Sequence, residues 1–142
     1  MTTAGVMLLV TGIVWSATPD KPTLPDIMEE LGIQIGLLAH AIMADDLVAV
    51  TAAATAIADH PRPSLTLAER GRFLARIGTD FPAFRQANAD VRSAAVAVRD
   101  AAEVGDRAEL AAAFYRLADS CLSCHTRFRD RLRNFYKPLD EG

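Results

Sequence analysis

Two cysteines and a histidine near the C-terminal end are spaced as the residues of a cofactor or metal site are. They form the sequence Cys121-Leu122-Ser123-Cys124-His125, a C-x-x-C-H pattern. This pattern is typical of covalent attachment of a c-type haem. On a helix these three positions share one face, so both sulfurs can reach the vinyl groups of one haem and His125 can bind its iron. The motif predicts one covalent haem c per chain, with His125 as an iron ligand.

The motif lies within a stripe of apolar residues that recurs at helical spacing. Steps of three and four residues place both sulfurs on the face of the helix that is expected to be buried. A buried cofactor requires this placement. The stripe consists of Leu110, Phe114, Leu117, Cys121, Cys124, Phe128 and Leu132.

Two other uses of a C-x-x-C pattern fit the sequence less well. A redox disulfide of this spacing usually accompanies a βαβ pattern, and no stretch of this sequence predicts a strand. A zinc site would need a fourth ligand, and His40 and His60 are the remaining histidines. Haem is therefore the favoured interpretation, and a non-haem helical bundle with a structural disulfide or metal site is an alternative.

The composition indicates a single all-α domain. The 142 residues are 51% hydrophobic and rich in alanine, with 6% aromatic residues, which suits packed helices. The net charge of −3, without a basic patch that contains aromatic residues, argues against nucleic-acid binding. No nucleophile–base pair or acid–base constellation is apparent, so we do not expect an enzyme.

The N-terminal segment carries no charge before Asp20. Residues 1–18 contain a short apolar stretch and then small residues near Ala17, which predicts a signal peptide. The uncharged run is also nearly the ~20 residues that a membrane-spanning helix needs, so an uncleaved anchor, inserting residues 4–18, is the alternative. Either form predicts a periplasmic domain over residues 19–142, soluble or anchored.

Four principal helices and one short helix are expected. Pro25 suits the first turn of one helix, Thr66 with Glu69 forms a capping box, and Gly105 ends a helix before Asp106 opens the last one. Short connections between long helices predict an antiparallel four-helix bundle, with the haem on its last helix. The expected ranges are about 25–44, 47–58, 66–77, 80–104 and 106–136.

The first helix has an inward stripe that begins at Met28. Met28 could be a soft thioether ligand of the iron or a flexible core residue. Gly32 and Gly36 leave a smooth groove on this helix, which predicts either close approach of another helix or room for a flat cofactor. The stripe consists of Met28, Leu31, Ile35, Leu38 and Ile42.

The remaining candidates are weaker. His40 lies about 18 Å along the helix axis from Met28, so it cannot bind an iron level with that residue. His60 is expected in a loop, and Met43 falls off the stripe. Arg127 and Arg131 are expected to be solvated, with a lesser claim to docking a redox partner.

A four-helix bundle with C-x-x-C-H on its last helix resembles the cytochrome c′ family, the class II c-type cytochromes. The resemblance spans about residues 22–134 and includes Phe128 and Arg129 after the motif and Gly105-Asp106 before the last helix. It implies that Arg129 lies beside the proximal histidine. It also implies a homodimer formed through the first two helices.

Members of this family differ in what lies on the other side of the iron. The stretch from Met28 to Gly32 resembles the low-spin pattern, which implies Met28 as the distal ligand opposite His125. High-spin members often carry an arginine one turn earlier, in contact with a haem propionate, and here that position is Leu24. The resemblance implies a periplasmic carrier of single electrons that meets redox partner proteins. The alternative is a five-coordinate cytochrome c′ that binds NO or CO.

Overall fold

The computed structural model describes residues 22–133, which form helices and short connections without a strand. The predicted N-terminal signal peptide or anchor and the predicted end of the last helix near residue 136 lie outside these residues. Within 22–133, no helix is long and apolar enough to cross a membrane. The helices are α1 (Leu24–Met43), α2 (Leu47–Ala58), α3 (Leu67–Ile77), the 3₁₀ turn η1 (Gly78–Asp80), α4 (Phe81–Val104) and α5 (Arg107–Leu132).

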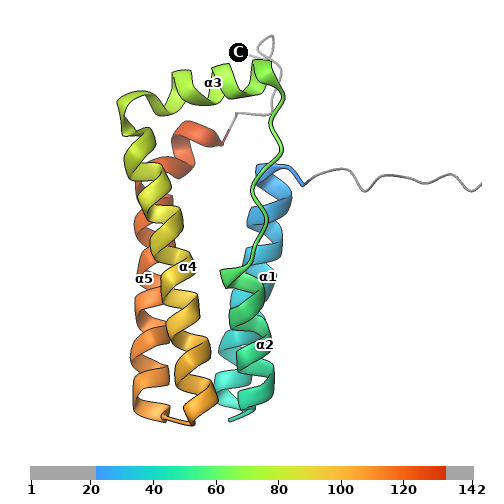
Figure 1. Ribbon diagram of the computed structural model, residues 1–142, viewed down its shortest axis with the longest axis vertical. Coiled ribbons are helices and arrows are strands. Elements are labelled where there is room, and N and C mark those ends of the chain that lie inside the picture. The colour runs from blue at the N-terminus through green and yellow to red at the C-terminus, as the bar shows by residue number, and fades with distance from the viewer. Residues whose placement is uncertain (1–21, 134–142) are drawn as a thin grey trace, which may run out of the picture.

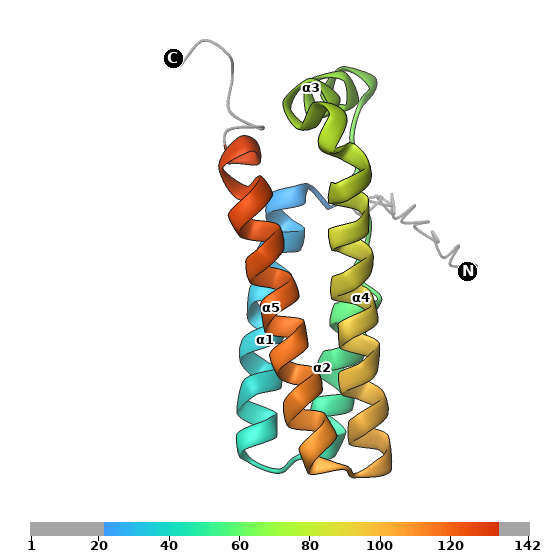
Figure 2. The same ribbon diagram turned by 90° about the vertical axis from the view of Figure 1, so that its left-hand side faces the viewer.

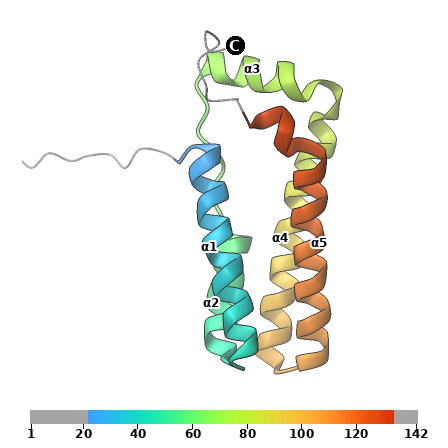
Figure 3. The ribbon, with the colours of Figure 1, turned by 180° about the vertical axis from the view of Figure 1, so that it is seen from behind.

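Helices α1, α2, α4 and α5 run along the long axis of the molecule, and α3 crosses one end (Figures 1 and 2). Each of the four is antiparallel to the next along the chain, so the predicted all-α, antiparallel four-helix bundle is confirmed. Figure 3 shows that α1 and α2 form one pair and α4 and α5 the other. No Cα atom of α1 lies within 8 Å of a Cα atom of α5. The backbones of these two helices are therefore not closely packed against each other.

Side-chain caps explain where most helices begin. Thr23 with Asp26 and Thr66 with Glu69 form capping boxes that open α1 and α3. Each box satisfies backbone N–H groups that lack a partner within the helix. The carboxylate of Asp106 accepts a hydrogen bond from the backbone N–H of Glu109 at 3.0 Å and opens α5. The predicted capping box at 66–69 is confirmed.

Asp80 uses its carboxylate to bind α5 rather than to cap α4. It precedes α4 without a capping hydrogen bond. Its two carboxylate oxygens instead accept hydrogen bonds from Arg127 at 2.7 Å and Arg131 at 2.6 Å. These bonds hold the turn before α4 against the C-terminal part of α5, and they lower the pKa of Asp80. Arg127 and Arg131 are thus ion-paired as well as solvated.

The hydrophobic core has two parts. The main core fills the bundle between α1, α2, α4 and α5, and it includes the fully buried Leu38, Val50 and Leu117. A second cluster, at the end covered by α3, consists of Phe73, Ile77 and Phe128 with partly buried neighbours. The inward stripe predicted for the last helix lies on the buried faces of α5, which confirms the helical periodicity of that stretch.

The first turns of α1 extend beyond the end of α2. Helix α1 has 20 residues and α2 has 12, so α1 is longer by about 12 Å at 1.5 Å per residue. Leu31, Ile35 and Ile42 pack against the main core, as predicted. Met28 is 39% exposed because α2 is too short to cover it, and its neighbour Ile27 is buried instead.

A buried polar network fixes the linker that follows α2. The side chain of Arg92, on α4, donates hydrogen bonds to the carbonyl oxygens of Ala58, at 2.7 Å, and of His60. The imidazole of His60 is 7% exposed and lies within hydrogen-bonding distance of the Ile57 carbonyl and the Asn88 amide. His60 is in a loop, as expected, but it is buried and serves to attach this linker to α4.

Candidate functional site

The two cysteines of the C-x-x-C-H motif lie where the two parts of the core meet. Both are on α5 and half-buried. Cys121 packs against the main core, and Cys124 packs against the second cluster. The motif therefore occupies the junction between the bundle interior and the end covered by α3. A flat group attached to both sulfurs would lie against apolar side chains of both clusters.

The half-buried environment of the two thiols favours their neutral, protonated form. Burial raises the pKa of Cys121 and Cys124 above the ordinary value, and the proximity of the two thiols raises that of Cys124 further. Reactive and metal-binding thiols need the opposite shift. Among residues 22–133, no group of three or more His, Cys, Asp and Glu side chains could hold a metal ion. A c-type haem would be held by thioether bonds to these two sulfurs, and such bonds need no thiolate metal site.

His125 follows the second cysteine and its ring is available to a ligand. The residue is exposed on α5, one position along from the half-buried Cys124. Within the described part of the chain its imidazole makes no hydrogen bond or ion pair. Neither ring nitrogen is therefore engaged by these residues, and either can bind a metal.

An exposed ion pair marks the register between α1 and α5. Asp45, in the turn after α1, pairs with Arg107 at the start of α5 at 3.0 Å. Met28 lies 17 residues before Asp45, and His125 lies 18 residues after Arg107. At 1.5 Å per residue, both lie about 25 Å from this turn along antiparallel helices. Met28 and His125 are therefore at the same level of the bundle.

These observations together fit a haem between α5 and α1. The attachment cysteines lie on an apolar junction, the histidine ring is free of partners among residues 22–133, and the thioether of Met28 is partly exposed at the same level. The two helices stay more than 8 Å apart between Cα atoms, as a group placed between them requires. Cys121, Cys124, His125 and Met28 remain the residues predicted to hold it.

A pocket of about 350 Å³ lies along the α4–α5 pair and has Cys124 in its wall. Its other lining residues include Ala87 on α4 and Phe128 on α5. The second cysteine can therefore be reached from the surface of the bundle, as attachment of a haem to a folded or partly folded chain requires.

The remaining sequence candidates are distributed around this region. Arg129 is exposed on α5, one turn after His125, and makes no ion pair among the described residues. His40 is exposed near the far end of α1, as expected, and Met43 is 83% exposed. Gly32 and Gly36 have open space where a Cβ atom would lie, so no described helix approaches them closely.

Comparison with known proteins identifies the family. The family model described as cytochrome C′ matches residues 26–129. No curated protein matches the chain, and no solved structure does so either. The match includes the first helix with Met28, the α5 motif and Arg129, and the observed four-helix bundle agrees with it. The chain therefore belongs to the cytochrome c′ family of c-type haem cytochromes.

Proposed function

We propose that this cytochrome carries single electrons in the periplasm, with His125 as the proximal and Met28 as the distal iron ligand. The observation that supports this proposal is the common level of Met28 and His125 on facing antiparallel helices, as the position of the Asp45–Arg107 pair indicates. A thioether is a soft ligand that suits haem iron, and a Met/His pair raises the reduction potential relative to harder ligands.

The haem supplies reversible exchange of one electron between Fe(III) and Fe(II). The chain's own residues set the conditions for that exchange. Cys121 and Cys124 fix the group covalently, and the apolar clusters beside them limit access of water. Met28 and His125, on two different helices, would hold the iron in the same way in both oxidation states. No catalytic residue is needed for this role.

The proposal is tested by visible absorption spectra of the ferric and ferrous protein, before and after addition of carbon monoxide. We expect low-spin spectra that carbon monoxide does not change. Met28→Leu should become high-spin and bind the gas, because leucine fills similar space without a ligand atom. Met43→Leu, at an 83% exposed position near the other end of α1, is the matched control and should behave as the unsubstituted protein.

A wild-type protein that is high-spin and binds carbon monoxide would reject Met28 as a ligand. It would favour the second candidate function, binding of NO or CO at a five-coordinate iron. One observation favours this alternative: Met28 belongs to neither core cluster, so little packing holds its side chain in place. Protein made with a working haem-attachment system that shows no haem bands would reject both functions.

We also propose that residues 1–18 direct the chain to the periplasm, as a cleaved signal peptide or as an anchor. The uncharged, apolar character of this segment supports that proposal.

A homodimer through α1 and α2 is our proposal for the assembled form. Helix α1 has no charged side chain from Leu31 to Met43 other than the titratable His40. Ile33 and Leu37 are about half exposed on this helix, at 52% and 53%, and they are separated by one turn. Gly36 beside them has open space around its Cα atom, which would allow a second copy to approach closely.

A further inference from the structure

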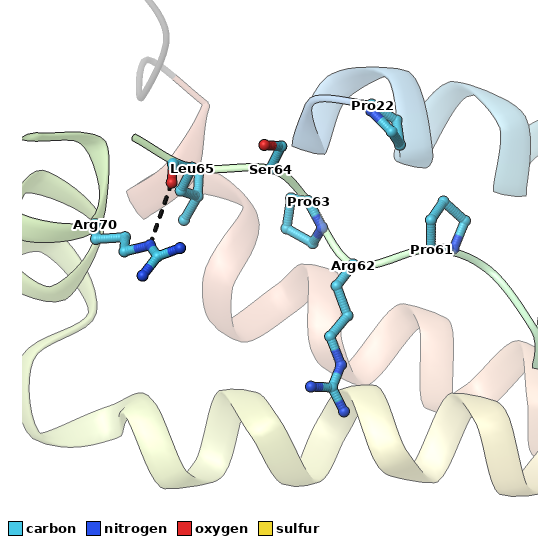
Figure 4. A pocket seen from close by; sticks show the side chains of 7 residues that line it. All are labelled: Pro22, Pro61, Arg62, Pro63, Ser64, Leu65 and Arg70. Atoms are coloured by element: carbon cyan, nitrogen blue, oxygen red, sulfur yellow. Dashed lines mark hydrogen bonds between the residues drawn. The ribbon is translucent and has the colours of Figure 1, made fainter. Parts of the chain in front are cut away.

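A pocket of about 430 Å³ lies between the start of α1 and the linker that joins α2 to α3 (Figure 4). Arg62 and Arg70 are the charged residues that line it. Leu65, also in its wall, packs against the same cluster as Cys124 of the haem motif. The pocket is therefore next to the haem region. Its lining residues are Pro22, Pro61, Arg62, Pro63, Ser64, Leu65 and Arg70.

The linker backbone around Arg62 is held on both sides. Before it, Arg92 donates a hydrogen bond to the carbonyl of the buried His60. After it, the backbone N–H of Ser64 donates to the Pro22 carbonyl at 3.0 Å. Arg62 stands between two prolines, which fix their own φ angles and favour an extended conformation for the residue that precedes each. The position of the Arg62 backbone is thus largely determined before any ligand binds.

The guanidinium of Arg62 is not used by the described residues. It makes no hydrogen bond or ion pair within 22–133, whereas Arg70 donates through Nε to the Leu65 carbonyl at 3.2 Å. Figure 4 shows the Arg62 side chain extending from the linker away from Pro22 and toward the side on which α4 and α5 lie. An exposed arginine on a fixed backbone, without a partner among the described residues, is suited to an anionic group between the two halves of the bundle.

A c-type haem brings two such anions, its propionates, which leave the ring at the edge opposite the vinyl groups. Cations next to the attachment cysteines on α5 are therefore badly placed to meet them, and Arg127 and Arg131 already pair with Asp80. Residues 22–59, which comprise α1 and α2, contain six acidic side chains and no Lys or Arg. The linker is the first place after α1 and α2 where the chain offers a positive charge.

We propose that Arg62 binds a haem propionate, with Arg70 beside it in the same pocket, and so supplies the positive charge that Leu24 cannot. This inference rests on the covalent haem but not on Met28 being the distal ligand. An arginine fork matches a carboxylate in a bidentate pair, and its charge keeps the propionate ionised. A positive charge near the iron also favours Fe(II) over Fe(III).

The test is a redox titration of the haem-containing protein from pH 5 to 9, with Arg62→Gln, Arg62→Lys and Arg85→Gln. Arg85 is exposed on α4 and lines neither pocket, so its substitution removes the same charge elsewhere. In Arg62→Gln we expect the Fe(II)/Fe(III) ratio at a fixed potential and neutral pH to fall by up to about tenfold. This corresponds to a decrease in the reduction potential of about 59 mV for one electron. We also expect the pH at which the propionate ionises to rise.

Arg62→Lys keeps the charge and should retain most of the wild-type potential, which a purely structural role would not predict. Arg85→Gln should match the wild type. The proposal is wrong if Arg62→Gln and Arg85→Gln give the same potential and pH profile. The presence of the haem bands separates this result from a failure of the proposed function, since absence of haem would be seen before any titration. A high-spin spectrum would show that Met28 does not bind the iron, but the Arg62 and Arg85 variants could still be compared.

Discussion

The imidazole of His60 is held in one tautomer by its neighbours. Its Nδ1 lies 2.7 Å from the Ile57 carbonyl oxygen, an acceptor, so Nδ1 carries the proton. Its Nε2 lies 3.0 Å from the Asn88 amide nitrogen, a donor, so Nε2 must accept. Exchanging the oxygen and nitrogen of the Asn88 amide would lose a hydrogen bond, because the amide oxygen accepts one from Nε of Arg92 at 3.3 Å. The network accommodates only a neutral histidine.

This arrangement predicts that acid destabilises the fold through His60. Burial, together with the nearby charge of Arg92, lowers the pKa of His60 in the folded state. The unfolded chain therefore takes up a proton at higher pH, and stability is lost as the pH falls below the ordinary histidine pKa. One such group contributes a slope of at most about 1.4 kcal/mol per pH unit. Urea unfolding between pH 8 and 5 measures it.

Two substitutions isolate this contribution. His60→Gln should show a shallower loss of stability toward acid than the wild type, since it removes the titrating group. His40→Gln removes an exposed histidine and should keep the wild-type slope. Equal slopes in His60→Gln and the wild type would show that His60 does not titrate between the two states.

At the scale of elements, α5 connects the two parts of the core. Leu110, in the main core, is 3% exposed, and Phe128, in the second cluster, is 2% exposed. The Phe128 ring packs edge to face on Phe84, with 5.3 Å between ring centroids. Such pairs add to the free energy of burial. The haem motif lies between these two anchoring side chains on one helix.

Truncation of either Phe128 or Leu110 should therefore lower stability, but only truncation of Phe128 should also affect the haem. Phe128→Ala should lower the free energy of unfolding by about 3–5 kcal/mol and Leu110→Ala by about 2–5 kcal/mol. Only Phe128→Ala should also shift the haem absorption bands, because Cys124 packs against the cluster that contains Phe128. Denaturant unfolding and visible spectra of both variants measure these effects. Unchanged bands in Phe128→Ala, or an equal shift in Leu110→Ala, would contradict this account.

The helices could be predicted from the sequence because their signals are local. The capping box at Thr66, the glycine after Val104 and the steps of three and four along α5 all act within a few residues. The C-x-x-C-H motif is local in the same way. It predicts Cys121, Cys124 and His125 as haem-binding residues without any knowledge of the fold.

The details that the sequence did not predict depend on residues far apart in the chain. His60 was expected in a loop, but its burial depends on Asn88 and Arg92, about 30 residues later. Asp80, at the start of α4, pairs with arginines about 50 residues later in the chain, which no local pattern indicates. The partial exposure of Met28 follows from the unequal lengths of α1 and α2, which a stripe on one helix cannot reveal.

At the scale of the whole molecule, the exposed apolar face of α1 predicts self-association. Ile33→Glu with Leu37→Glu places two like charges on this face and should convert a dimer to a monomer. Leu67→Glu, at an 86% exposed position on α3, introduces a charge away from the proposed interface and should leave the dimer intact. Size-exclusion chromatography with light scattering measures the masses. A wild-type monomer would refute the dimer, as would a dimer that persists in the double variant.

The uneven distribution of charge between residues 22–59 and 60–133 affects how the molecule orients in the electric field of a charged surface. Residues 22–59 carry six acidic groups and no Lys or Arg, while residues 60–133 carry thirteen arginines and nine acidic groups. Because residues 22–59 form one helix pair and residues 60–133 form α3 and the other pair, this division gives the described part of the protein an electric dipole moment. A charged surface will orient the molecule before contact, and added salt will weaken that alignment as the Debye length shortens.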